Sequence, residues 1–177
     1  MKTLFIFSLL IIFSNSVASS EYQKIISHSF SELKILEKND FDMEAINSQL
    51  SPKELKKFNG IFSLAIKDYD GNNLTDFVAL TYNKNVMPDL IKNHRREYSL
   101  VLCLQSKEYF CKKIKTFNRG YPSSSYLSSA NLYSNLECEK KLFKKGMPAF
   151  YLEPAYGNIW EWGVYHSGKV FICSAGD

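Results

Sequence analysis

The sequence predicts an α+β protein in which N-terminal helices pack on an antiparallel β-meander sheet of about seven or eight strands, reinforced by disulfide bonds. Three observations lead to this prediction. Helical periodicity is confined to the first 60 residues of the 177-residue chain. From residue 61 onward, short runs of alternating apolar and polar residues are separated by turn residues. All four cysteines also lie in that second part.

Residues 1–18 have the pattern of a secretory signal peptide. Lys2 precedes an apolar run at residues 4–13, and small residues at 16–18 form a cleavage pattern. The apolar run is shorter than the about 20 residues that span a bilayer. We therefore expect an exported protein, periplasmic or secreted, whose mature chain begins at Ser19 and has no further membrane span.

The charge of the mature chain argues against a nucleic-acid partner. Lys2 is the only charged residue among the first 18, so its removal lowers the formal net charge from +4 to +3. Nucleic-acid-binding proteins concentrate a much stronger basic field on one face.

The cysteines predict two disulfides. Cys103, Cys111, Cys138 and Cys173 are an even number in a chain expected to be exported. They allow three connectivities, among which the sequence does not choose.

Residues 19–60 are expected to be a helical segment that forms one domain with the β region at 61–177. The first helix is predicted from apolar residues that share one helical stripe, namely Tyr22, Ile26, Phe30, Leu33 and Leu36.

A second, shorter helix is predicted to begin at Ser51. Ser51 can cap it, Pro52 suits its first turn, and Glu54 completes a capping box. Asn59 and Gly60 are expected to end it.

The β region is read from its alternating runs. Strands are expected within residues 62–66, 78–82, 98–105, 109–117, 136–143 and 148–153, with a serine-rich loop at 120–129. The chain ends in a predicted hairpin, 159–166 and 169–173, joined by a Ser167-Gly168 turn. In that register Trp162 lies near Cys173 and Val164 near Phe171.

The loop "DYDGNNLTD", residues 68–76, lies between the first two of these strands and predicts a calcium site. The proposed ligands alternate along it: the side chains of Asp68, Asp70, Asn72 and Asp76, and the backbone carbonyl of Leu74. Ca²⁺ takes six to eight oxygens at about 2.3–2.6 Å, and these groups with a water would meet that demand.

An ordinary turn is the alternative to a calcium site in this loop. Gly71 and Asn73 tolerate the positive φ that such a tightly wound loop needs, but Asp, Asn and Gly also form ordinary turns without an ion. The loop is not an EF-hand, because an EF-hand has Gly at position 6 and Glu at position 12, where this chain has Asn73 and Ala79.

The stretch "IFSLAIKDYDGNNLTDFVAL" resembles the strand–loop–strand unit of FG-GAP and VCBS-type repeats, with the pattern D-x-D/N-G-D/N-G-x-x-D. This chain departs from the pattern at Asn72, where an acid is usual, and at Asn73, where a glycine is usual. The resemblance implies a structural calcium loop. The whole mature chain is also similar to small exported bacterial proteins that carry a single such unit and a C-terminal W-x-x-G-K-F hairpin. The stretch "WGVYHSGKVFICSAGD" is a loose counterpart of that hairpin. One copy does not make a propeller, which needs four or more blades.

No nucleophile, metalloprotease or phosphate-binding motif occurs in the chain. We therefore predict a non-catalytic exported binding protein whose partner is another protein in the envelope or outside the cell, as in inhibition of, or immunity to, a periplasmic or cell-wall-acting enzyme. A possible partner loop is Ser167-Gly168-Lys169, which resembles the S-G-x-x-Y loop of exported lysozyme inhibitors, with Phe171 in place of the tyrosine.

The alternative is a small exported hydrolase or glycan-binding module. Glu153 and Glu161 would form its carboxylate pair. The aromatic residues expected beside them are Tyr151, Tyr156, Trp160 and Trp162.

Overall fold

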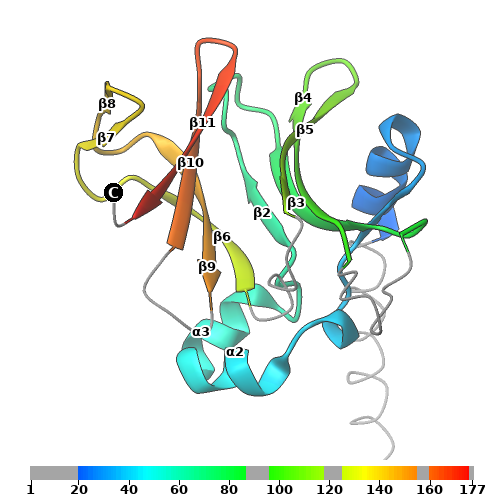
Figure 1. Ribbon diagram of the computed structural model, residues 1–177. Coiled ribbons are helices and arrows are strands. Elements are labelled where there is room, and N and C mark those ends of the chain that lie inside the picture. Colours follow the sequence, from blue (N-terminus) through cyan, green and yellow to red (C-terminus); the bar gives the residue numbers. More distant parts are fainter. Residues whose placement is uncertain (1–19, 87–95, 118–124, 155–159, 176–177) are drawn as a thin grey trace, which may run out of the picture.

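The computed structural model describes residues 20–86, 96–117, 125–154 and 160–175, and in them two antiparallel sheets enclose the main hydrophobic core (Figure 1). The predicted signal peptide lies outside the described residues. Within them, no helix is long and apolar enough to cross a membrane.

The first sheet has five strands in the order β1-β3-β4-β5, with β2 also paired to β3. Its strands are β1 (Leu33–Ile35), β2 (Leu64–Lys67), β3 (Asp76–Asn83), β4 (Tyr98–Gln105) and β5 (Tyr109–Phe117). β1 pairs with the end of β3 and β2 with its beginning, so both lie along the same edge of β3.

The second sheet has four strands in the order β11-β10-β9-β6. They are β6 (Ser125–Asn131), β9 (Pro148–Pro154), β10 (Trp160–His166) and β11 (Lys169–Ala175). A separate hairpin is formed by β7 (Leu136–Cys138) and β8 (Lys141–Phe143).

The α+β class and the antiparallel pairing are confirmed, but the prediction of a single meander sheet is wrong. The described residues contain eleven strands, and β6 pairs with β9 instead of continuing from β5. The physical reason is burial on both faces of the central strands. In β3, Val78 and Leu80 face the main core while Phe77 and Ala79 face a second cluster, so each face needs its own cover.

The predicted serine-rich loop also contains structure that the sequence reading missed. Residues 125–129 belong to β6, where Leu127 is fully buried opposite Leu152 of β9. Serine is a weak strand signal, and here the pairing partner decides the conformation.

The prediction that one helical stripe runs through residue 36 is wrong. The first helix occupies residues 20–29 of the described chain, and Leu33 and Ile35 lie in β1. The Gln23 side chain joins the two: its Nε2 donates to the Leu33 carbonyl (3.1 Å), and its Oε1 accepts from the Ile35 N–H (2.7 Å).

The later helices, α2 (Met43–Gln49) and α3 (Pro52–Phe58), follow local signals. The capping box of α3 is confirmed: Ser51 Oγ accepts from the Glu54 N–H, and Glu54 accepts from the Ser51 N–H. Asn59 ends the helix in the left-handed conformation, at φ 48°.

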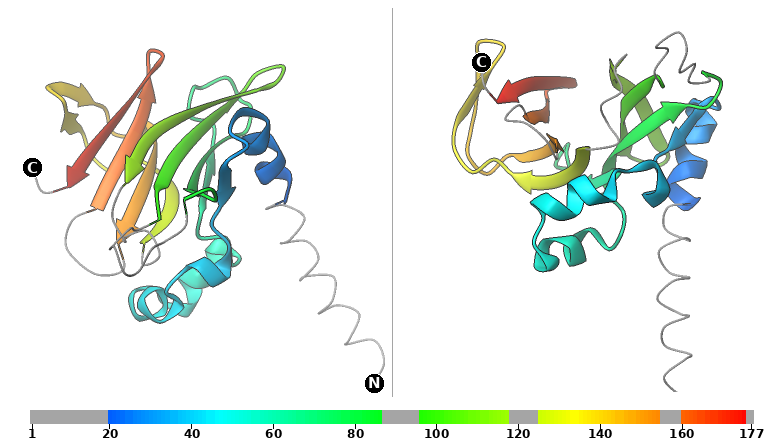
Figure 2. Two further views of the ribbon diagram at one scale, coloured as in Figure 1. Left: turned by 45° about the vertical axis from the view of Figure 1, so that its right-hand side comes forward. Right: turned by 60° about the horizontal axis from the view of Figure 1, so that its bottom comes forward.

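The N-terminal helices cover different faces of the five-stranded sheet. The prediction placed them together on one sheet. Ile46 of α2 joins the main core between the sheets, with Leu100 and Phe150. The helix at 20–29 instead lies on the far side of the five-stranded sheet (Figure 2). There Ile26 belongs to the second cluster, together with Phe77 of β3. The β7–β8 hairpin covers the outer side of the second sheet in a third cluster, which contains Phe143, Tyr151, Trp162 and Val164.

The two sheets meet where β2 lies beside β6. The Leu127 N–H donates to the Phe62 carbonyl (2.8 Å), and Ser129 Oγ donates to the Ile66 carbonyl (3.0 Å). In Figure 1 the β2 and β6 strands lie above α3.

The C-terminal hairpin has the predicted register, with Trp162 opposite Cys173 and Val164 opposite Phe171. On its other side β10 places Gly163 opposite Phe150. A Cβ at Gly163 would lie 2.0 Å from Phe150 Cζ, so glycine is needed to admit the ring.

Candidate metal centre

The acidic loop connects β2 to β3, and strand pairing brings its two ends together. Lys67 lies opposite Asp76, which is the first residue of β3 and is fully buried. The loop between them is anchored by Tyr69, whose buried hydroxyl donates to the Ala65 carbonyl at 3.2 Å and whose ring packs edge-on against Phe150.

Asp76 organises the base of the loop. Its Oδ2 accepts from the N–H groups of Tyr69 (2.8 Å) and Asp70 (3.3 Å), and its Oδ1 accepts from the Gln105 N–H at the end of β4 (2.8 Å). One carboxylate therefore connects the β2–β3 loop to β4.

Asp68 winds the tip of the loop. Its Oδ1 accepts from the N–H groups of Gly71 (2.7 Å) and Asn72 (3.2 Å), and its Oδ2 accepts from that of Asn73 (2.9 Å). The positive φ expected at two positions is present, 81° at Gly71 and 64° at Asn73.

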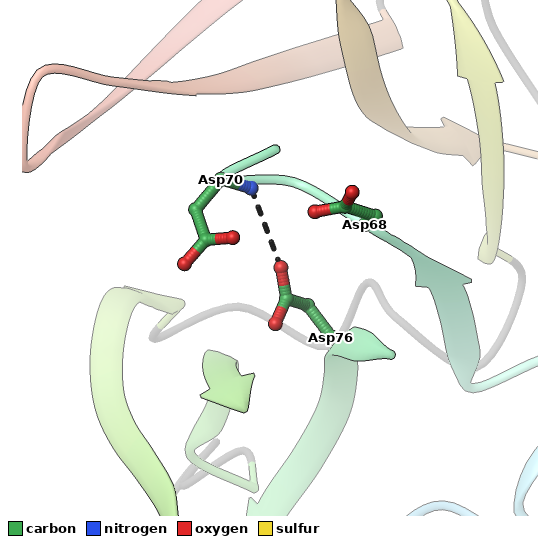
Figure 3. Close-up of side chains that lie close together, drawn as sticks. All are labelled: Asp68, Asp70 and Asp76. Atoms are coloured by element: carbon green, nitrogen blue, oxygen red, sulfur yellow. Dashed lines mark hydrogen bonds between the residues drawn. The ribbon is translucent and has the colours of Figure 1, made fainter. Parts of the chain in front are cut away.

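Three of the five predicted ligand residues bring carboxylates together. One oxygen from each of Asp68, Asp70 and Asp76 lies within 4.8 Å of the others. Two oxygens on one Ca²⁺ are at most about 5 Å apart, twice the Ca–O distance, so this spacing suits a shared cation. Figure 3 shows the Asp76 carboxylate pointing into the space between Asp68 and Asp70.

The other two predicted ligands are the side-chain oxygen of Asn72 and the backbone carbonyl of Leu74. Asn72 uses its side-chain oxygen to accept from the Leu74 N–H (2.7 Å), and its Nδ2 donates to Asp70 Oδ2 (3.1 Å) and to the Gln105 carbonyl (2.7 Å). These bonds make Asn72 a brace between the loop and β4. The Leu74 side chain is 40 % exposed, and coordination by the Leu74 carbonyl stays a prediction.

Gln105 is the residue of this site that sequence reasoning missed. Besides its backbone bonds, its Oε1 accepts from the Thr75 N–H (3.1 Å) and from the Tyr109 hydroxyl (3.3 Å). It lies 29 positions beyond Asp76, and only strand register brings it to the loop. No local pattern in the sequence marks it.

The electrostatics of the loop favour a positive ligand. Burial raises the pKa of the Asp76 carboxyl, and the charge of Asp70 adds to this, whereas the backbone N–H groups of Gln105, Tyr69 and Asp70 oppose it. A cation beside these carboxylates would offset both the burial and the repulsion.

Both predicted disulfides are present, and their pairing is now defined. Cys103 of β4 bonds Cys111 of β5, and Cys138 of β7 bonds Cys173 of β11. The second bond attaches the β7–β8 hairpin to β11 of the second sheet. Two disulfides are consistent with an oxidising compartment.

The predicted partner loop is the tip of the β10–β11 hairpin. Ser167 and Gly168 form the turn with φ of 52° and 80°, and Lys169 follows opposite His166. All three residues of the loop are exposed.

The carboxylate pair of the alternative function does not form. Glu161 lies opposite Leu152, the neighbour of Glu153, so the two carboxyl groups point to opposite faces of the sheet. Glu161 pairs with Lys115 of β5, whereas Glu153 accepts from the hydroxyls of Tyr126 and Ser128.

Of the four aromatic residues expected to stack on a sugar, the two whose side chains the structure describes are buried. Tyr151 and Trp162 are buried in the third cluster. Tyr156 and the Trp160 side chain lie outside the described residues.

Searches against protein-family models, curated proteins and solved structures found no match to this chain.

Proposed function

We propose that this chain is an exported, non-catalytic binding protein whose β2–β3 loop holds Ca²⁺ as a structural clamp, in the manner of a single FG-GAP/VCBS-like unit. The observation that carries the proposal is the convergence of Asp68, Asp70 and Asp76. Carboxylate oxygens are the ligands that Ca²⁺ prefers.

The proposed role of the ion is mechanical. Asp76 and Asn72 already link the loop to Gln105 of β4, so a cation held by the carboxylates would stiffen the junction of β2, β3 and β4. The bound ion would leave the fold unchanged and reduce the local opening of this end of the sheet.

Export is supported by the signal-peptide pattern at residues 1–18 and by the two disulfides. The partner we propose is a protein of the periplasm or cell wall, such as an enzyme that this chain inhibits or confers immunity to. The exposed Ser167–Lys169 tip is a candidate contact, because its turn is held by the flanking β10–β11 ladder.

Calcium binding is tested by isothermal titration of the metal-free mature protein with CaCl₂. The wild type should give heat with a Kd of about 10⁻⁴–10⁻³ M, and Asp70→Ala should give none. Glu108→Ala, which removes an exposed acid from the next hairpin, is the matched control and should bind like the wild type. Equal heats for wild type and Asp70→Ala, or no heat for either, would overturn the calcium proposal.

The binding role is tested by affinity capture from an envelope extract, beside peptidoglycan-binding and glycan-cleavage assays. We expect one polypeptide that Lys169→Glu fails to capture and that the control Lys107→Glu retains. Binding or cleavage of glycan without capture of any polypeptide would contradict the proposed role.

A further inference from the structure

A pocket of about 530 Å³ opens between α3 and the seam of β2 with β6. Its apolar wall includes Phe58, Leu64, Ile66 and Leu127. Small-molecule sites have volumes of about 300–1,000 Å³, with mostly apolar walls and a few converging polar groups. This pocket is on neither the calcium loop nor the Ser167–Lys169 tip.

One carboxylate of the pocket wall is held in place by neutral groups. Glu153 Oε2 accepts from the Tyr126 hydroxyl (3.0 Å), and its Oε1 accepts from Ser128 Oγ (2.5 Å). Among the described residues, no lysine, arginine or histidine forms an ion pair with Glu153. Its negative charge is therefore oriented without being neutralised.

Unlike Glu153, the two charged residues that α3 contributes to the pocket have opposite signs and offset each other. Glu54 accepts from the N–H and the hydroxyl of Ser51 in the capping box, and Lys57 lies one turn later on the helix. With Glu54 and Lys57 cancelling, Glu153 leaves the pocket lining with a net charge of −1.

Aromatic rings adjoin this charge. Phe58 packs edge-on against Tyr126 with ring centroids 5.2 Å apart, and both residues line the pocket. Ring faces near a carboxylate favour a cation with an apolar body, since cation–π attraction adds to the charge pairing.

We propose that this pocket binds a small organic cation, a protonated primary amine on an apolar body, with its ammonium group at Glu153 and its body against Phe58 and Ile66. The proposal does not rest on calcium binding or on the proposed protein partner.

The test uses benzylamine, which is protonated at pH 7, with benzyl alcohol and benzoate as neutral and anionic probes. Amide chemical-shift perturbation of the ¹⁵N-labelled mature protein locates and measures binding. Benzylammonium should perturb residues of α3, β2 and β6, and benzyl alcohol should bind about tenfold or more weakly. Glu153→Gln should weaken benzylammonium binding about 10- to 100-fold, whereas Glu137→Gln, at an exposed acid of β7, should leave it unchanged.

A second pair of variants decides the question if Glu153→Gln does not fold. Ile66 is 41 % exposed in the pocket wall, so Ile66→Lys would place a tethered ammonium in the pocket that Glu153 also lines, and Ile66→Met keeps the wall apolar. The lysine variant should lose benzylammonium binding, and the methionine variant should retain it. Equal binding of alcohol and amine, perturbations outside the pocket, or no perturbation by the amine would overturn the proposal.

Discussion

Asp76→Asn tests the loop as a folded element, independently of any ion. Asp76 is fully buried and accepts three backbone hydrogen bonds, from Tyr69, Asp70 and Gln105. An asparagine of the same shape offers one acceptor oxygen and one NH₂ group. Whichever way it is oriented, an NH₂ group faces at least one of these N–H donors.

The magnitude follows from those contacts. A buried donor without an acceptor costs about 1–3 kcal/mol, and the bonds lost were made to a charged group. The substitution also removes the burial cost that raises the pKa of Asp76, which offsets part of this loss. We expect a net destabilisation of about 2 kcal/mol, or a fall in Tm of about 4–8 °C for a chain of this size.

The assay is thermal and urea unfolding of the mature protein in EDTA at pH 7. Asp70→Asn is the control, because Asp70 is exposed and its carboxylate accepts only from Asn72 among the bonds seen here, so its cost should stay below about 0.5 kcal/mol. An Asp76→Asn variant as stable as Asp70→Asn would refute the role assigned to Asp76.

Three further predictions follow from the structure. Because the pKa of Asp76 is raised in the folded protein, this carboxyl ionises at lower pH in the unfolded chain. The stability advantage of the wild type over Asp76→Asn should therefore shrink as pH rises from about 4 to 7, measured by urea unfolding across that range. An advantage that grows with pH would contradict the direction of the shift. Gly163→Ala should lose about 2–3 kcal/mol in the same assay, because the added methyl overlaps the Phe150 ring; a neutral result would show that the ring can move aside. Removing the disulfide that spans 35 residues, with Cys138→Ala and Cys173→Ala, should cost about 1 kcal/mol more stability than removing the one that spans 8 residues, because the longer loop restricts the unfolded chain more. Calorimetry of both double variants gives the comparison, and the opposite order would rule out this entropic account.

Features that depend on neighbours in the chain were predictable. The capping box of α3 joins Ser51 to Glu54, and the Ser167-Gly168 turn sets the register of the last hairpin. The spacing of Asp68, Asp70 and Asp76 likewise indicated that their carboxylates converge, because all three lie in one short hairpin loop.

Features that depend on distant partners were not predictable. Leu33 fits a helical stripe in the sequence, but it lies in β1 and pairs with Asn83 of β3. Gln23 donates a hydrogen bond to the Leu33 carbonyl there. Glu153 and Glu161 are close in the chain, yet strand alternation and register put them on opposite faces of a sheet.

The sequence by itself determined the α+β class, the even set of cysteines, the helix cap, the final hairpin and the wound acidic loop, because local hydrogen bonds and backbone preferences specify each of them. Only the tertiary structure decided the division into two sheets, the disulfide pairing and the connection of Asp76 to Gln105. These depend on which apolar faces bury against each other across long stretches of chain, and residue order alone does not encode that choice in any short window.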